Sequence, residues 1–137
     1  MSGVYARNRN LSSFEFFTAA VRVRTEVTRL VTSGAVPKSY RFVLAVPMAE
    51  TARGVVANLV RADAFFPSSE EAVAERKRCM TLAVAGLDML YQDVQLLLSL
   101  GLPVRASRFE DLCNGISEAV RLIKGARSGV RLVRREG

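Results

Sequence analysis

The chain has 137 residues, half of them hydrophobic, and a net charge of +7 from 20 Lys and Arg against 13 Asp and Glu. This length suits one domain with a substantial core. Two cysteines and no histidine are too few ligands for a zinc site. The positive charge favours a polyanionic partner, which could be RNA, DNA or an acidic protein surface.

The first residues and the cysteines indicate the compartment. Residues 1–11 carry two arginines and no acid, which predicts a basic N-terminal arm, and they lack the apolar stretch of a signal peptide. Cys79 and Cys113 lie in helical apolar patterns, which favours free thiols in a reducing cytoplasm over a disulfide. The longest uncharged run, residues 94–104, is too short to span a membrane. We therefore expect a cytoplasmic protein without a membrane partner.

The first predicted helix follows Ser12–Glu15, a Ser-x-x-Glu pattern typical of a capping box. Apolar residues recur at three- and four-residue steps through residues 16–31, which indicates one buried face. Gly34 is expected to end this helix.

The second predicted helix has Pro37 in its first turn, where a missing N–H has no cost. Its apolar positions extend from Tyr40 to Phe66, and Pro67 is expected to stop it. Pro47 lies inside this helix and would leave the carbonyl group of Val43 without its usual donor. It therefore predicts a kink, either as a functional hinge or as a simple bend.

Two later helices complete the pattern. Ser68–Glu71 predicts a second capping box, followed by a helix that ends at Gly101 and has Tyr91 and Leu98 among its apolar positions. A third box at residues 107–110 starts a last helix that Gly125 is expected to close. No strand alternation competes with these helices. Short connections predict an all-α, up-down-up-down four-helix bundle over residues 12–125.

The apolar surface of the middle helices is broader than one stripe. Adjacent apolar pairs such as Val43-Leu44 and Val55-Val56 point about 100° apart on a helix, and Leu96–Leu98 repeats this feature. A monomer would expose much of this surface, so we expect an oligomer. The alternative is that these helices are central in the bundle.

Catalytic chemistry is absent from the sequence patterns. There is no histidine, no Ser, Cys or Lys beside an obvious base, and no Gly-rich phosphate loop. Glu70, Glu71 and Glu75 lie where a helix start favours acids, and their spacing is not a metal motif. We therefore expect no catalytic residue, no metal and no cofactor, and a binding or scaffolding protein rather than an enzyme.

Lys38 and Arg41 are an unusual pair. They are three residues apart and share a face at a helix start, where the dipole disfavours cations. Either they form an internal ion pair, or they hold RNA phosphate or an acidic protein patch. The neighbouring aromatic residues, like most aromatics in this chain, fit core positions, so stacking on bases is not expected.

Other cations are candidates for the same role. Arg22 and Arg29 share a helix face with Glu26 between them, and at least one member of Arg76–Arg78 is expected to pair internally. Residues 126–137 form a predicted basic tail that either binds a polyanion or only aids solubility. The predicted nucleic-acid or partner contacts are Lys38, Arg41, Arg22, Arg29, Arg76, Lys77, Arg78, Arg127, Arg131, Arg134 and Arg135.

The stretch VPKSYRFVLAVPMAETARGVVANLVRAD, residues 36–63, resembles the second helix of a family of small four-helix-bundle proteins. This family includes the accessory variability determinant (Avd) of diversity-generating retroelements and relatives encoded in ribosomal RNA intervening sequences. A third helix with a basic opening and a short fourth helix are also similar. The residues that carry the resemblance are Pro37, Lys38, Tyr40, Arg41, Phe42, Leu44 and Ala62.

The resemblance implies a specific function. Proteins of this family are basic and non-enzymatic, assemble as pentameric rings, and bind nucleic acid and the reverse transcriptase of the element during mutagenic retrohoming. We therefore expect a homopentamer that binds RNA or DNA mainly through phosphates. Two alternatives are a family member that binds RNA or another protein without a retroelement, and a structural oligomer whose charge serves only solubility.

Overall fold

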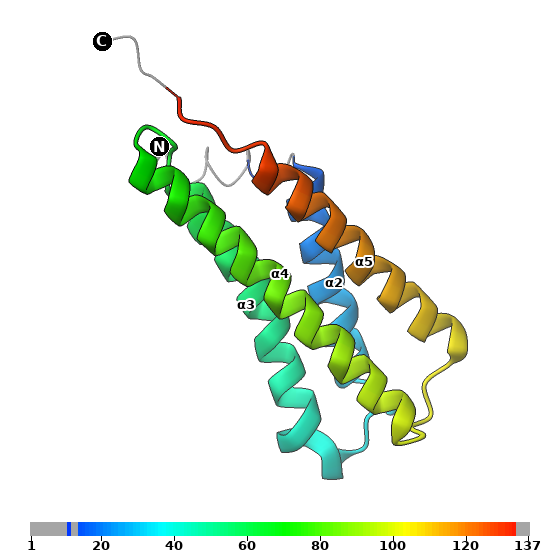
Figure 1. The fold of residues 1–137 in the computed structure, drawn as a ribbon. Helices are drawn as coiled ribbons and strands as arrows, with labels where there is room; N and C mark the ends of the chain where they lie inside the picture. Colours follow the sequence, from blue (N-terminus) through cyan, green and yellow to red (C-terminus); the bar gives the residue numbers. More distant parts are fainter. Residues whose placement is uncertain (1–10, 12–13, 134–137) are drawn as a thin grey trace, which may run out of the picture.

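The computed structural model describes residue 11 and residues 14–133 of the chain. Within this part the protein is all-helical, with four long helices and no strand (Figure 1). The prediction of an all-α fold with four helices is confirmed. The long helices are α2 (Glu15–Val31), α3 (Val46–Ala64), α4 (Glu70–Ser99) and α5 (Ala106–Ser128), and two short segments, η1 (Lys38–Tyr40) and η2 (Arg41–Ala45), precede α3.

Each long helix packs against two others. The α2 and α4 helices each contact both α3 and α5. Buried apolar residues of all four helices form one core, at the three- and four-residue spacing that the sequence predicts. The contact between α3 and α4 is close at Gly86, where a Cβ atom would lie 2.8 Å from Cγ2 of Val55. A larger residue at this position would push the two helices apart.

Two of the predicted capping boxes are wrong. The α4 helix begins with Ser69, one residue after the predicted cap, and its hydroxyl accepts a hydrogen bond from the backbone N–H of Ala72 at 3.1 Å. This shift places Ala72 where the box needs a glutamate. The α5 helix begins before Ser107, with Arg105 at its N-cap. The first predicted cap, Ser12, lies outside the described residues, and α2 has Phe14 at its N-cap without a side-chain hydrogen bond.

The predicted helix ends also need correction at two glycines. The α2 helix ends at Val31 with Thr32 at its C-cap, before Gly34 is reached. The α5 helix continues through Gly125 to Ser128, because Ala126 packs against the core and extends the apolar stripe. The predicted boundary between bundle and tail at residue 126 is therefore three residues too early. Gly101 does end α4, with the positive φ of 66° that favours glycine.

The irregularity predicted at Pro47 takes the form of a change in helix type. The backbone is 3₁₀-helical in η1, π-helical in η2 and α-helical from Val46 onward. A π-helical turn pairs each carbonyl with the N–H five residues later, so the hydrogen-bond register changes immediately before the proline. The chain thus accommodates Pro47 in the first turn of α3, where its missing N–H has little cost.

Several apolar side chains lie on the surface. Phe42 and Val43 are 80% and 72% exposed. On α3 and α4, Val60, Met89 and Leu96 are also at least 40% exposed, so packing within one chain leaves part of their apolar surface uncovered. The expected core positions Phe66, Tyr91 and Leu98 are also exposed.

The continuous helical segment Lys38–Ala64 has the length and composition of a membrane span, and 28% of its most apolar window is buried. The central helix of a soluble bundle and a membrane helix share these two properties. Length and composition alone therefore do not assign this segment to a membrane.

Candidate nucleic-acid interface

The structure brings Lys38 and Arg41 into one groove between the end of α2 and the start of α3. Pro37 is extended and places Lys38 at the start of η1, and Arg41 begins η2. The groove has a volume of about 640 Å³, and no acid lines it. Its other lining residues are mainly small or apolar: Val31, Thr32, Ser33, Gly34, Val36, Pro37, Ala45, Val46 and Ala49.

Both cations are available to a ligand. Lys38 and Arg41 are exposed, and neither side chain makes a hydrogen bond or ion pair with the described part of the chain. The predicted alternative of an internal ion pair is therefore not seen within these residues. At the start of a helical segment, an anion would offset the unfavourable interaction between these cations and the helix dipole.

A second groove continues along the same side of the bundle. Arg24 of α2 meets Arg53 and Arg61 of α3 around a groove of about 350 Å³, which again has no acid in its lining. Arg53 follows Ala49 of the first groove by one helical turn, so the two grooves lie on one side of α3. We call this surface the α2–α3 basic face; its cations are Arg24, Lys38, Arg41, Arg53 and Arg61.

Sequence reasoning missed three of these five arginine and lysine residues. Arg24 is separated from Arg53 by the whole α2–α3 connection, so no local spacing relates them. Arg53 and Arg61 are eight apart, close to two helical turns, which is the one local signal that could have placed them together. Arg61 also donates a hydrogen bond to Oδ1 of Asn58 at 3.4 Å.

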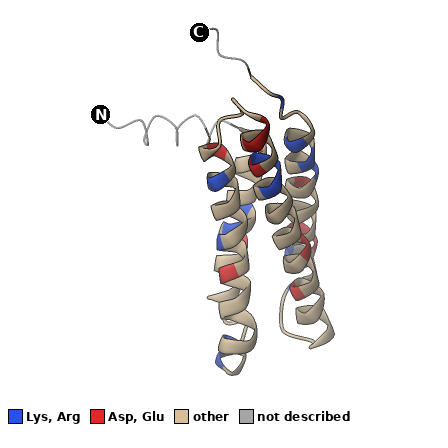
Figure 2. Ribbon diagram, turned by 60° about the vertical axis from the view of Figure 1, so that its left-hand side comes forward, with Lys and Arg blue, Asp and Glu red and all other residues tan. Residues whose placement is uncertain are grey.

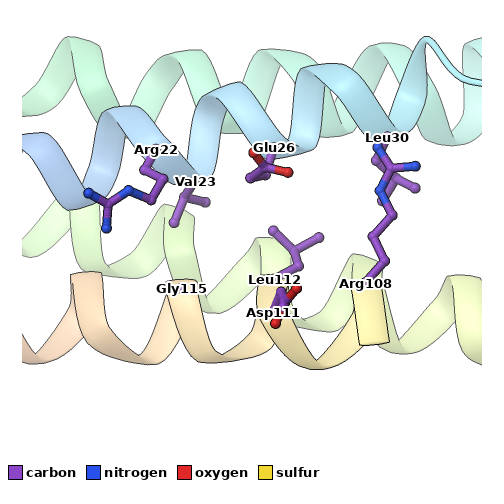
Figure 3. A pocket seen from close by; sticks show the side chains of 8 residues that line it. All are labelled: Arg22, Val23, Glu26, Leu30, Arg108, Asp111, Leu112 and Gly115. Carbon is purple, nitrogen blue, oxygen red and sulfur yellow. The ribbon is translucent and has the colours of Figure 1, made fainter. Parts of the chain in front are cut away.

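The groove between α2 and α5 has a different electrostatic character. Arg22 and Arg108 lie at its two ends, and Glu26 and Asp111 lie between them (Figure 3). Its volume is about 280 Å³. Glu26 pairs with Arg29, whose Nη1 is 2.9 Å from Oε1 of the glutamate. The predicted pair Arg22 and Arg29 therefore faces nearby acids, unlike the cations of the α2–α3 basic face.

The basic segment of α4 is largely engaged within the chain. Arg76 donates hydrogen bonds to the carbonyl oxygens of Ala62 and Phe65, at 3.3 and 3.1 Å, and so satisfies the C-terminal end of α3. Arg78 pairs with Glu75 at 3.2 Å, and this hydrogen bond raises the pKa of Arg78 above its ordinary value. The expectation of at least one internal pair is confirmed. Lys77 has no side-chain partner among the described residues.

The C-terminal cations lie at the opposite end of the bundle from Lys38. Arg127 is helical and donates a hydrogen bond to Oγ1 of Thr81 on α4 at 3.1 Å, and Arg131 donates to the carbonyl of Ser128. Arg134 and Arg135 lie outside the described residues. Figure 2 shows acidic and basic segments together along the bundle, while its lower tip, where Figure 1 places the start of α3, is basic.

Burial perturbs the pKa of two ionisable side chains among the described residues. Burial raises the pKa of the Cys113 thiol, which keeps it protonated and weakly nucleophilic. Burial likewise raises the pKa of the Asp93 carboxyl. Over residue 11 and residues 14–133, no group of three or more His, Cys, Asp or Glu is placed to hold a metal ion.

Comparison with known protein families gives no match for this chain, and no curated protein is significantly similar to it. The linings of the two grooves of the α2–α3 basic face together contain five cations and no acid.

Proposed function

We propose that this protein is a non-enzymatic accessory protein that binds nucleic acid along the α2–α3 basic face. The observation that supports this is the pair of grooves between α2 and α3, which bring together five cations and have no acid in their linings. From Lys38 to Arg61 the face extends roughly 35 Å along the helix axis, enough for several nucleotides. Phosphate contacts of this kind give affinity with little sequence preference.

The proposed biological context comes from the resemblance to the Avd family. In this proposal the chain is an Avd-like partner of a retroelement reverse transcriptase, located in the cytoplasm, and its helices run up-down-up-down in each subunit of a pentamer. Short connections between successive helices support the topology. A reverse transcriptase gene and a repeat pair beside the coding sequence would distinguish this context from that of an RNA-binding relative without a retroelement.

The groove at the end of the basic face gives the first prediction. We expect the double variant Lys38→Ala, Arg41→Ala to weaken RNA binding, because two phosphate contacts are lost. Each phosphate contact with a single strand contributes roughly 0.7 to the steepness of log affinity against log salt. The loss of two contacts should therefore make this slope shallower by about 1.4. Thermal unfolding should be unchanged, because both side chains are exposed and have no partner in the described chain. Fluorescence anisotropy over a salt series measures the slope.

A matched control separates a local effect from the loss of overall charge. Arg121→Ala with Lys124→Ala removes the same formal charge from exposed positions on α5, where Arg121 pairs with Glu118 and neither residue lines the two grooves. This control should leave the salt slope close to that of the unmodified protein. If the Lys38 and Arg41 variant melts several degrees lower and still binds RNA normally, these cations stabilise the fold and the proposed interface is wrong.

A second candidate function is a structural oligomeric scaffold whose charge serves only solubility. It is favoured by the exposed apolar side chains of α4, which a partner helix could cover. The two functions differ in one simple measurement. Both predict a particle several times the 15.0 kDa chain mass, but a scaffold would not bind RNA even at low salt.

A further inference from the structure

The side chain of Phe42 is unusual because it is an aromatic ring that the fold leaves in solvent. It is 80% exposed, more than any other large apolar side chain in the described part of the chain. It lies in the π-helical segment η2, directly after Arg41 and four residues after Lys38. Sequence reasoning expected the aromatic residues to be buried, which would have excluded base stacking. The exposure of Phe42 removes that objection.

The surroundings of this ring are cationic. Residues 32–49, which contain Phe42, include Lys38 and Arg41 and no acid. The α2–α3 connection also lies beside the start of α5, because Ala35 and Arg105 line one groove, in which Glu26 and Asp111 are the acids. Residues 95–107, which contain Arg105, have no acid either. The exposed ring therefore lies in the chain segment that carries Lys38 and Arg41, and the groove lined by these two cations has no acid in its lining.

An exposed ring next to unpaired cations matches the chemistry of single-stranded nucleic acid. Aromatic side chains stack on unpaired bases while neighbouring cations hold the phosphates. In a duplex the bases are already stacked inside the helix, so a ring at the protein surface cannot reach their faces. We infer that Phe42 is a stacking platform for an unpaired base, and that the protein prefers single-stranded RNA or DNA to a duplex. This inference depends on the proposed function and specifies its substrate class.

The test compares substitutions at Phe42 in the full chain. The probes are a short labelled oligouridine strand and the same strand in a duplex. Phe42→Ala should weaken binding to the single strand roughly 5- to 150-fold and leave duplex binding unchanged. Phe42→Tyr should retain the affinity because it keeps a stacking ring. Phe42→Leu, which keeps apolar bulk without a ring, should resemble Phe42→Ala. Val43→Ala is the matched control, since Val43 is the exposed neighbour without a ring.

The possible outcomes separate this inference from the proposed function. If the unmodified protein binds neither probe at low salt, the proposed function fails. If it binds both probes equally and Phe42→Ala changes neither affinity, phosphate binding stands and stacking is wrong. Full affinity of Phe42→Leu would also overturn stacking. Normal RNA binding by Phe42→Ala, together with loss of phosphatidylserine vesicle binding or a lower particle mass, would make the ring a lipid or subunit contact instead.

Discussion

Arg76 shows how one side chain of a basic cluster can serve the fold. The sequence places it in a cationic run at the start of α4, yet its guanidinium bonds to two carbonyl groups at the end of α3. The last carbonyls of a helix lack the usual N–H partner four residues later, so these bonds add donors at the end of α3, where the carbonyl of Ala62 also accepts from the backbone N–H of Phe65. Arg76 therefore joins the ends of two neighbouring helices.

A substitution at this position should affect stability more than binding. We expect Arg76→Ala to lower the melting temperature by roughly 3–8 °C, because hydrogen bonds from a charged donor to two carbonyls are lost. RNA affinity should change little, since the guanidinium is already engaged within the chain. Thermal unfolding followed by circular dichroism measures the first effect. Lys77→Ala is the control, and an equal loss of stability there would show that charge, rather than the α3 contact, is responsible.

At the scale of one element, α4 carries a regular apolar stripe on its surface. Leu82, Met89 and Leu96 are 42%, 51% and 44% exposed and recur at intervals of seven residues, so they lie on one side of the helix. Gly86 lies between the first two in the sequence, and a Cβ atom there would lie 2.8 Å from Cγ2 of Val55 on α3. A seven-residue apolar repeat is the spacing that packs against a second helix, which makes this stripe the best candidate for the subunit contact.

A pair of substitutions tests this role of α4. We expect Met89→Gln with Leu96→Gln to shift the particle toward the 15.0 kDa chain mass, because two apolar side chains of the proposed contact become polar. Folding should be retained, since both side chains are exposed in the single chain. Light scattering after size-exclusion chromatography measures the mass.

The control for this experiment lies on the same helix. Tyr91 and Leu98 are also exposed and seven residues apart, but each lies two positions, or about 200°, around α4 from the stripe. Tyr91→Gln with Leu98→Gln should leave the particle mass unchanged. A protein that is monomeric at micromolar concentration before any substitution would remove the proposed assembly altogether.

At the scale of the whole molecule, positive charge occurs in two settings. On the α2–α3 basic face the cations line grooves without acids, whereas near the start of α4 and the end of α5 they bond to chain atoms or to glutamate. Binding should therefore depend more on the first set than on the second. The terminal residues 134–137 add two arginines and one glutamate. The salt dependence of RNA affinity can show whether these arginines contact phosphates.

Removal of residues 134–137 tests whether the tail contacts nucleic acid. The helical position of Arg127 shows that a cut at residue 126 would shorten α5, so the cut belongs after Val133, whose N–H bonds to the carbonyl of Pro67 at 2.8 Å. If both arginines contact phosphates, the salt slope should fall by about 1.4. Titration of the truncated protein with RNA at several salt concentrations measures this, and an unchanged slope would assign the tail to solubility.

The sequence by itself determined the features that depend on near neighbours in the chain. Apolar residues at three- and four-residue steps predicted four helices, because helix periodicity is local. The spacing of Lys38 and Arg41 likewise predicted that they share one face, and in the structure both line one groove. The stop at Gly101 was predictable because a left-handed backbone conformation favours glycine.

Only the tertiary structure decided the features that depend on partners far along the chain. Gly125 did not end α5, because packing of the next turn against the core outweighs the weak helix propensity of one glycine. Arg24 lies close to Arg53 only because α2 packs on α3. The exposure of Phe42 depends on which side of the chain the neighbouring helices cover. Burial and contact are set by the arrangement of the helices in space, and the helical periodicity of a single segment does not contain that information.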